Sequence, residues 1–488
     1  MSSRQIVDKS LGNIFWSYLS FFTTKALNLV AIVIIALYLS PAEFGLMAFA
    51  LVIIGYLELL QGFGLGAYLI STREDVEEAA HAVFAFAIAA SAALFAALWA
   101  GADALAGFFE QPALADVLRF LAFSLLIESV AQVHNSLLQR ELKFRLKIMP
   151  EVGRGLVRGL LSIYLAASGF GVWALVYGHI AGMLAWSAIL MVVRPWRPCR
   201  APRLAVLWSA VRYGSNMVGG SLCNAVPRTL DQVLIGKILG PAPLGLYALA
   251  QRMPQLALKT VGMEANKVIH PIMSQIQRDP EALRTYYYGL VRYLGLTIFP
   301  AGVMLAAIAS PLIHVIYRPE WHGMIRTMEL LSIAFAFGVL NHLPGTVYKA
   351  INRSDLFLQI ALINLPFPIV AFWIAVPYGI EAVAVAQIGL VFVLYAPHFV
   401  ILRSAIGVEA LRTAQAAAPG LACAVTTAAG GVLARLAVPD PGLVQLAVTG
   451  TGALAAYLLA LWFMGPEVFR EVARIAAAKL RKGRRRAG

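Results

Sequence analysis

Residues 39–50 read LSPAEFGLMAFA and residues 239–250 read LGPAPLGLYALA, so that seven of twelve positions are identical at an offset of 200 residues. The identical positions include a proline at 41 and 241 and a glycine at 45 and 245. Each copy lies in a short turn between two long apolar runs. A hairpin that is duplicated within a membrane chain is typical of a transporter built from two related lobes.

The duplication extends beyond this hairpin. Residues 139–144 (QRELKF) match residues 352–357 (NRSDLF), and residues 171–176 (GVWALV) match residues 379–384 (GIEAVA), at offsets of 213 and 208. Proline and glycine also punctuate unrelated helical hairpins, but three matching pairs in the same order favour duplication. Because six predicted spans separate equivalent points, the two copies share one orientation, with their axis along the membrane normal.

The composition indicates a membrane protein that is helical throughout. Of 488 residues, 60% are hydrophobic and 13% are charged, whereas a soluble protein carries roughly 25% charged residues. The apolar runs predict an all-α polytopic protein with about fourteen transmembrane helices. The predicted spans are residues 13–39, 44–70, 82–105, 115–139, 147–167, 172–193, 209–239, 245–269, 287–311, 327–350, 356–376, 381–402, 416–437 and 443–464. The first run is too long for a signal-peptide core and lacks a small-residue cleavage site, so we expect it to span the membrane.

The duplication and the spans together predict four parts of the chain. Residues 1–200 form an N-terminal lobe of six spans, residues 201–412 form a pseudo-symmetric C-terminal lobe of six spans, and residues 413–465 add two helices outside the duplication. Residues 466–488 form a basic cytoplasmic tail with one apolar stripe. Such an amphipathic tail is expected either to lie on anionic membrane lipids or to remain solvated without a specific partner.

Basic residues segregate to alternate connections between the predicted spans. They fill the connections within residues 140–147, 194–203, 278–284, 353 and 403–412, whereas those at 40–43, 107–111, 168–171, 240–243, 377–379 and 438–441 carry none. Arg318 departs from this pattern. The positive-inside rule therefore places the basic connections and both termini in the cytoplasm. The same asymmetry accounts for the net charge of +14, so no nucleic-acid partner is expected.

The sequence lacks the patterns that enzymes and metalloproteins carry. Its three cysteines, Cys199, Cys223 and Cys423, are too few and too scattered for a disulfide framework or a metal cluster. There is no Ser/His/Asp arrangement, metal-ligand spacing or phosphate-binding loop, and no predicted connection is long enough for a soluble catalytic domain. We therefore expect a transport protein without a cofactor rather than an enzyme.

Several ionisable side chains fall within predicted spans, where a charge costs about 2.5–3.5 kcal/mol and usually faces a cavity or a partner. Lys25 lies near the middle of the first span and either lines a cavity or snorkels to the headgroups. Arg228 and Asp231 lie one turn apart on the seventh span, after Pro227. They form either an anion site with a proton- or sodium-sensitive carboxylate, or a fixed ion pair.

Two other spans carry basic pairs. Arg252 and Lys259 share one face of the eighth span, which corresponds by pseudo-symmetry to the second span with Glu58. Arg154 and Arg158, four residues apart on the fifth span, either collect anionic headgroups or fix the topology.

Two further features concern the spans themselves. Glu128 is expected to pair with a neighbouring basic side chain. Prolines within the spans predict kinked helices that neighbouring helices tolerate, and they lie at positions 227, 254, 344, 366, 368 and 397.

Short motifs follow one another in order over the first three quarters of the chain. They are LSPAEFG at 39–45, GF at 62–63, FFEQP at 108–112, GFGVWALV at 169–176, RPWRP at 194–198, LDQVLIGK at 230–237 and RSDL at 353–356. Together they resemble the polysaccharide transporter (Wzx-like) flippases of the MOP superfamily, relatives of MATE antiporters and lipid II flippases. The chain departs from that pattern at Leu37, where relatives often carry an arginine, and near Gly62, where the nearest preceding acid is Glu58.

The resemblance implies an architecture and a function. Two six-helix lobes surround a central cavity that alternates between the two sides of the bacterial inner membrane. Such proteins turn an undecaprenyl-pyrophosphate-linked oligosaccharide from the cytoplasmic to the periplasmic leaflet for exopolysaccharide, O-antigen or capsule synthesis, alongside polysaccharide polymerase and export machinery. We expect the anionic head to be bound by Lys25, Arg154, Arg158, Arg228, Arg252 and Lys259, with ion coupling through Asp231 and Glu58.

Two other functions compete with this hypothesis. A MATE-like antiporter for cationic drugs needs acids that face the cavity, whereas the ionisable residues within these spans are mostly basic. A membrane glycan polymerase or ligase generally needs a long periplasmic loop, and the longest outer connections, around residues 107–111 and 317–323, are too short for one.

Overall fold

A computed structural model describes residues 27–62, 64–72, 75–141, 143–200, 203–259 and 269–470. Within these ranges all regular secondary structure is helical. Nine helical segments of the described chain are long and apolar enough to cross a membrane, which confirms an all-helical, multi-pass membrane protein. Contacts divide the chain into two compact units, residues 1–245 and 246–488, and each is described by itself.

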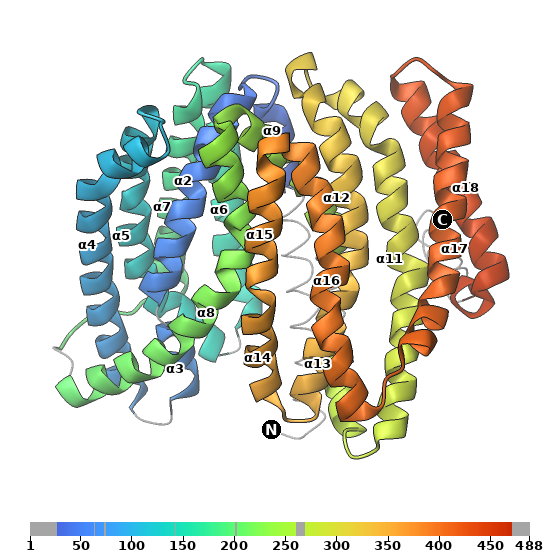
Figure 1. The fold of residues 1–488 in the computed structure, drawn as a ribbon. Helices are drawn as coiled ribbons and strands as arrows, with labels where there is room; N and C mark the ends of the chain where they lie inside the picture. The colour runs from blue at the N-terminus through green and yellow to red at the C-terminus, as the bar shows by residue number, and fades with distance from the viewer. Residues whose placement is uncertain are drawn as a thin grey trace, which may run out of the picture. The chain divides into compact units, whose positions relative to one another are not determined.

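The first unit consists of helices that are mostly long enough to span a bilayer. They are α2 (Pro41–Gly62), α3 (Leu65–Ser71), α4 (Val76–Phe108), α5 (Ala113–Arg140), α6 (Phe144–Ala167), α7 (Val172–Val193) and α8 (Leu204–Leu239). Residues 27–35 are also helical. Helix α4 packs against α5, and α6 packs against α7 (Figure 1). Helix α5 also contacts α2, α3 and α7, so it joins the two pairs.

Helix α8, the first helix of the predicted second copy, packs within the first unit. It contacts α2, α3 and α4 and runs obliquely to them (Figure 1). Midway along α8, Thr229 Oγ1 lies 2.5 Å from Tyr56 Oη of α2. At its end, Lys237 Nζ donates to the carbonyl oxygen of Phe108 and forms an ion pair with Glu110 Oε1 at 2.8 Å. These contacts fix the end of α8 to the connection between α4 and α5.

The two copies of the duplicated hairpin meet within the first unit. Gly45 lies against Pro241, and Gly245 lies against Pro41. A Cβ atom at either glycine would overlap the carbonyl oxygen of the opposite proline, so only glycine permits this approach. The contact is reciprocal, because each copy supplies one glycine and one carbonyl.

Short-range capping explains where several helices begin. Ser40 and Glu43 form a capping box at the start of α2, in which the Ser40 amide donates to Glu43 Oε2 at 2.7 Å. At the start of α4, Asp75 Oδ1 accepts from the Glu77 amide at 3.0 Å. In the second unit, Asp279 accepts from two backbone amides of the first turn of α11 (Pro280–Ile316). Each cap satisfies an amide that would otherwise lack an intrahelical partner.

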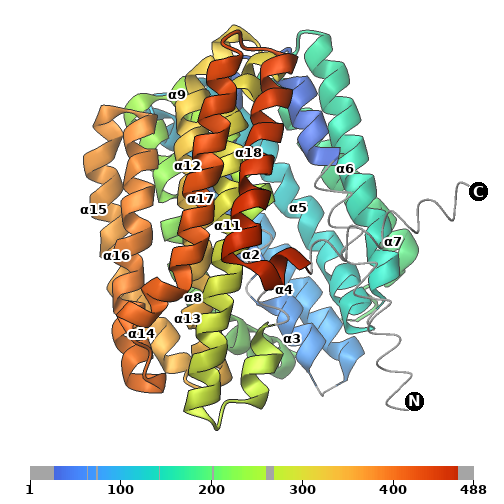
Figure 2. The ribbon, with the colours of Figure 1, turned by 90° about the vertical axis from the view of Figure 1, so that its right-hand side faces the viewer.

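The second unit begins within α9 and contains the remaining helices. They are α9 (Pro241–Pro254), η1 (Gln255–Lys259), α11, η2 (Pro319–Met324), α12 (Ile325–Gly338), η3 (Val339–His342), α13 (Leu343–Ala350), α14 (Ser354–Asn364), α15 (Pro366–Ala375), η4 (Val376–Tyr378), α16 (Ile380–Ile406), α17 (Ala410–Ala437) and α18 (Leu443–Met464). Helix α11 packs against α12 and α17, and α17 packs against α18 (Figure 2).

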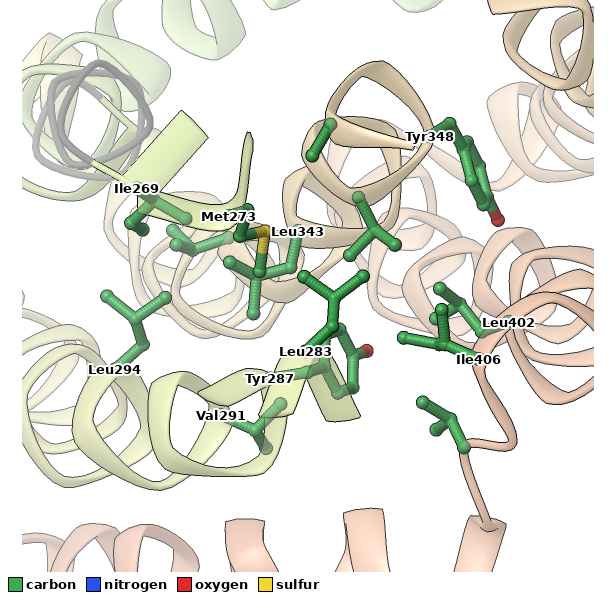
Figure 3. Close-up of a cluster of buried hydrophobic side chains, with 14 of the residues drawn as sticks. Ile269, Met273, Leu283, Tyr287, Val291, Leu294, Leu343, Tyr348, Leu402 and Ile406 are labelled. Carbon is green, nitrogen blue, oxygen red and sulfur yellow. The ribbon is translucent and has the colours of Figure 1, made fainter. Parts of the chain in front are cut away.

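A hydrophobic cluster joins several of these helices. Leu283, Tyr287 and Val291 of α11 are fully buried and lie near Leu343 of α13 and Leu402 of α16 (Figure 3). Within a membrane such side chains stabilise the fold by van der Waals packing rather than by removal from water. The cluster therefore holds together segments that are far apart in the sequence.

Prolines interrupt some predicted spans but not others. A π-helical turn, Gln255–Lys259, follows Pro254, and a 3₁₀ segment, Val339–His342, precedes Pro344. Helix α15 begins at Pro366 after a break at Leu365. In contrast, α8 continues through Pro227 and α16 through Pro397. The predicted spans 245–269, 327–350 and 356–376 are thus not single regular helices.

Candidate functional site

The register between α2 and α5 locates the polar side chains of the first unit. Gln61 Nε2 donates to the carbonyl oxygen of Leu125 at 3.0 Å, across 64 residues of sequence. Gln132 Nε2 donates to the carbonyl oxygen of Gly62 at 3.5 Å, across 70 residues. Further along, Arg140 donates to three carbonyl oxygens at the end of α3, across 68 to 71 residues. The two helices therefore run parallel, with positions about 70 residues apart lying side by side.

This register brings Glu58 of α2 next to Glu128 of α5. Both side chains are half-buried, and both interact electrostatically with Arg154 of α6 as well as with each other. Oε2 of Glu128 is buried and has no hydrogen-bond partner among the described residues. When all three groups are ionised, they carry together a formal charge of −1.

Arg154 and Arg158 lie on the face of α6 that packs against α7. A Cβ atom at Gly182 of α7 would lie 2.9 Å from Cβ of Arg158 and 3.1 Å from the carbonyl oxygen of Arg154. His179, one turn earlier on α7, is only 4% exposed and interacts electrostatically with both arginines. In the described structure neither of its ring nitrogens has a hydrogen-bond partner. We define the mid-helix cluster as Glu58, Glu128, Arg154 and His179.

The predicted pair on α8 is split between two environments. Arg228 is exposed, whereas Asp231, one turn later, is 3% exposed and accepts from the Gln232 amide at 2.9 Å. The contact between Thr229 and Tyr56 places this turn of α8 against α2, two residues before Glu58. The structure thus brings Arg228 and Asp231 to the helix that carries Glu58.

Two of the other predicted cations lie in the second unit. Arg252 lies on α9 in the second unit and is exposed. Lys259 ends the π-helical turn η1, and only its backbone is described. Lys25 lies outside the described residues.

The basic motif residues at the helix ends are paired. NH1 of Arg140 donates to the carbonyl oxygen of Leu69 at 2.8 Å, as part of its contact with α3. Nε of Arg194 lies 2.7 Å from Glu141 Oε1, and Lys143 lies 2.6 Å from Glu141 Oε2. Lys143 and Arg194 hold the pKa of Glu141 below its usual range. These motif side chains therefore act as clamps between helices.

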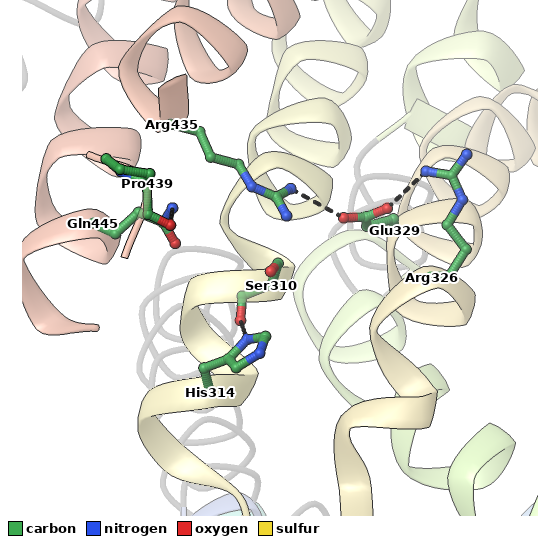
Figure 4. Close-up of polar contacts among 7 residues, drawn as sticks. All are labelled: Ser310, His314, Arg326, Glu329, Arg435, Pro439 and Gln445. Carbon is green, nitrogen blue, oxygen red and sulfur yellow. Dashed lines mark hydrogen bonds and ion pairs between the residues drawn. The ribbon is translucent and has the colours of Figure 1, made fainter. Parts of the chain in front are cut away.

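Polar contacts of the second unit include a three-residue charge network. Glu329 of α12 lies between two arginines, with Arg326 NH1 at 2.9 Å and Arg435 NH1 of α17 at 3.5 Å (Figure 4). His314 Nδ1 contacts the carbonyl oxygen of Ser310 at 2.8 Å. The Glu329 carboxylate is thus held by two cations, in contrast to Glu128.

Sequence reasoning noted Glu128 but did not place it in the site, and it did not single out His179. The available signal was the spacing of 70 residues between Glu58 and Glu128. That spacing becomes informative only when the register of α2 and α5 is known. The register depends on Gln61 and Gln132, and their partners are backbone carbonyls that no sequence pattern identifies.

The described fold is similar to that of solved membrane transporter structures. The described structure matches the lipid II flippase MurJ, in an inward closed conformation, with a TM-score of 0.75 and 13% identity, over 93% of this chain and 99% of that one. It also matches a multidrug resistance MATE family transporter of the MOP superfamily, in an inward-facing conformation, with a TM-score of 0.60 and 15% identity, over 80% of this chain and 98% of that one. The fold is therefore the one shared by MurJ and the MATE transporters.

The polysaccharide biosynthesis protein family matches residues 34–326, which is more than half of the chain. The chain therefore belongs to this family, and the resemblance predicted from its motifs is confirmed.

Named relatives of the chain act in several polysaccharide systems. It is 26% identical over 322 residues to the succinoglycan biosynthesis transport protein ExoT of Rhizobium meliloti (strain 1021), covering 66% of this chain and 65% of that protein. It is 23% identical over 355 residues to the lipopolysaccharide biosynthesis protein WzxC of Escherichia coli (strain K12), covering 72% and 71%. With the teichuronic acid biosynthesis protein TuaB of Bacillus subtilis (strain 168), the identity is 24% over 310 residues, covering 62% and 63%.

The matches to ExoT and TuaB thus span slightly less than two thirds of those proteins. The relatives and the proteins of similar fold are transporters and polysaccharide biosynthesis proteins rather than enzymes.

Proposed function

We propose that this protein is a flippase that moves an undecaprenyl-pyrophosphate-linked oligosaccharide repeat unit from the cytoplasmic to the periplasmic leaflet. The product would serve exopolysaccharide, O-antigen or capsule synthesis. One observation carries the proposal: a chain of the polysaccharide biosynthesis family has a fold that matches a lipid II flippase over 99% of that flippase. Lipid II and the proposed substrate share a polar head on a polyprenyl tail.

The physical task is to carry a pyrophosphate and its sugars across about 30 Å of hydrocarbon. A water-filled cavity between two six-helix lobes would replace the hydration of the head while the tail remains in lipid. Arginine suits pyrophosphate because its planar fork binds two oxygens at once. In this proposal the pyrophosphate head is bound by Arg228 and Arg252, whose side chains are both exposed. Other basic residues would contact the head along its path: Lys25, Lys259, Arg154 and Arg158.

The orientation follows from the charge pattern of the connections. Both termini and the basic connections lie in the cytoplasm, and fourteen spans cross the inner membrane, of which the last two lie outside the duplication. The start of α2 and the end of α8 then face the periplasm, where the duplicated hairpins meet. The basic tail lies on anionic lipids, and the polymerase and export machinery receive the product.

The membrane potential alone favours outward movement of the head. The cytoplasmic side of the membrane is at negative potential. Outward movement of each negative charge is therefore favoured by about 2.3 kcal/mol per 100 mV of membrane potential. Ion coupling through Glu58 or Asp231 would add to this drive. Collapse of the potential at a constant pH gradient should therefore slow flipping sharply in membrane vesicles, whereas an unchanged rate would exclude voltage as the driving force.

The proposal is tested by the fate of lipid-linked oligosaccharides after the gene is deleted. We expect completed repeat units to accumulate on the cytoplasmic leaflet and the surface polysaccharide to be lost. Wild-type protein and the control variant Arg412→Ala, whose exposed side chain pairs locally with Glu409, should restore export. Arg228→Ala and Arg252→Ala should not restore it.

The alternative outcome is equally specific. Normal polysaccharide combined with increased sensitivity to cationic drugs would exclude the flippase and support a MATE-like antiporter. The MATE-like fold and the half-buried carboxylates Glu58 and Glu128 are the observations that support this alternative.

A further inference from the structure

We propose that Glu58 and Glu128 form a binding site for one shared proton, with Arg154 as the fixed counter-charge, and that this proton is exchanged during transport. The inference rests on the proposed transport function and identifies its coupling ion and a residue, Glu128, that completes the site.

The first argument is geometric. The hydrogen bonds from Gln61 to Leu125 and from Gln132 to Gly62 fix the parallel register of α2 and α5. They lie one turn beyond Glu58 on α2, and their α5 positions flank Glu128. Glu58 and Glu128 therefore face each other at the same height of two neighbouring helices. Two carboxylates placed together in a poorly hydrated site do not both remain ionised, because their repulsion favours one protonated member.

The second argument is the balance of charge. Glu58, Glu128 and Arg154 interact mutually and sum to −1 when ionised. One proton makes the group neutral, which is the state that a membrane interior favours. A metal cation would instead meet the positive charge of Arg154. No group of three or more His, Cys, Asp or Glu side chains that could hold a metal ion occurs among the described residues.

The third argument comes from buried polar groups that lack partners. Gln61, one turn after Glu58, is 1% exposed, and its Oε1 accepts no hydrogen bond within the described structure. Oε2 of Glu128 is in the same state, as are both nitrogens of the buried His179 beside Arg154. Oε1 of Gln61, Oε2 of Glu128 and one ring nitrogen of neutral His179 are thus buried acceptors without donors, which costs free energy. They indicate a site that receives a proton donor, either a protonated carboxyl group or a water molecule.

The surrounding helices define the rest of the local charge. Helix α6 contributes Arg158 in addition to Arg154, and α7 contributes His179. Helix α8 carries Arg228 and Asp231 on the turns around the contact with Tyr56. The charged residues of α4, which are Glu77, Glu78 and Asp103, lie toward its ends, as does His81, and α3 has none. On α5 itself, His134 lies beside Trp196, toward the C-terminal end of the helix and beyond Glu128.

The proton site can be tested on the purified full-length protein in lipid nanodiscs by infrared titration. We expect the wild type to show the carbonyl band of a protonated carboxyl group at neutral pH, corresponding to one proton. Glu58→Gln and Glu128→Gln should each remove this band, because the remaining carboxylate and Arg154 already sum to zero charge. Arg154→Gln should shift the loss of the band to higher pH, because two carboxylates without a counter-charge hold the proton more tightly.

The matched control is Glu329→Gln, which removes a carboxylate held by two arginines in the second unit. This variant should leave the band unchanged. Size-exclusion profiles establish that each variant is folded. An unaltered band in both Glu58→Gln and Glu128→Gln would overturn the shared-proton site, even if the deletion experiment establishes flipping.

The transport readout separates the two proposals further. In vesicles with an imposed pH gradient, the wild type should flip faster than without the gradient, and this difference should disappear in Glu128→Gln. If the carbonyl band responds to the substitutions as expected but the protein flips no lipid-linked oligosaccharide, the proton site is supported and the flippase proposal is rejected. Retention of the full gradient response by Glu128→Gln would overturn the coupling role.

Discussion

Charged residues of the first unit fall into two regions with opposite properties. At the helix ends, Arg140 caps the carbonyl oxygens of α3, and Arg194 is paired with Glu141. In the mid-helix cluster, Glu128 Oε2 and both nitrogens of His179 lack hydrogen-bond partners within the described residues. Arg194 belongs to a motif of the family resemblance, and Arg140 and Glu141 belong to the internal repeat, whereas Glu128 and His179 belong to neither. The paired residues secure the helix ends, and the proposed proton site lies among the unpaired ones.

The contact between the duplicated hairpins should give the largest stability effect at the helix ends. In Gly245→Ala the new methyl group overlaps the carbonyl oxygen of Pro41, so the backbone must shift, at about 3 kcal/mol. The measurement is the thermal unfolding midpoint in detergent. The control is Gly55→Ala on α2, where a Cβ atom meets nothing within 4 Å, and its midpoint should not fall. Equal midpoints for the two variants would contradict the hairpin contact.

Loss of the Arg140 clamp should have the next largest effect. Arg140→Ala leaves the carbonyl oxygens of Leu69, Ile70 and Thr72 without this donor. Because these oxygens regain water, we expect a net loss of about 2 kcal/mol in the free energy of unfolding. Arg412→Ala, whose side chain is exposed, is the control and should lose less than about 1 kcal/mol. A loss in Arg140→Ala no greater than that in the control would show that the clamp is dispensable.

Acidification should lower the stability of the folded state by a smaller amount than loss of the Arg140 clamp. The pKa of Glu141 is lowered by Lys143 and Arg194, so the ionised carboxylate stabilises the folded state above the pKa of the unfolded chain. This stabilisation is lost as the pH falls through the lowered pKa of the folded state. Unfolding midpoints measured across the acidic range should fall less steeply with pH in Glu141→Gln than in the wild type. Parallel curves would contradict the assignment.

The mid-helix cluster should contribute least to stability. Glu128→Gln removes a charge whose Oε2 has no hydrogen-bond partner in the described structure. We therefore expect a free energy of unfolding within about 1 kcal/mol of the wild type, together with the altered pH response described above. If Glu128→Gln lowered the free energy of unfolding as much as Arg140→Ala does, the mid-helix cluster and the helix ends would not differ in their contribution to stability.

Much of the fold was predictable from the sequence because its signals are local. Apolar runs predicted most helices, and the Ser40–Glu43 capping box begins α2 where the predicted turn ends. The interruptions after Pro254 and before Pro344 were harder to locate. A proline predicts a kink, but neighbouring helices decide whether the backbone breaks or continues, as it does at Pro227 in α8.

The candidate site was predictable only in part. Glu58 and Arg154 were identified because a charge within an apolar span is conspicuous. Their meeting with Glu128 depends on hydrogen bonds from glutamines to backbone carbonyls 64 and 70 residues away. Such contacts leave no periodic signal. The association of α8 with α2 likewise depends on tertiary contacts, such as that between Tyr56 and Thr229.

The reciprocal hairpin contact also bears on how the chain arose. Each copy offers its proline carbonyl to the glycine of the other, so one surface patch meets a second version of itself. Contacts of this isologous type are the ones that close twofold-symmetric homodimers. If the two copies arose by duplication, as the repeat predicts, this is the type of contact through which two separate halves would dimerise. Within this chain the two patches depend on each other, because neither glycine can acquire a side chain unless the opposite backbone moves.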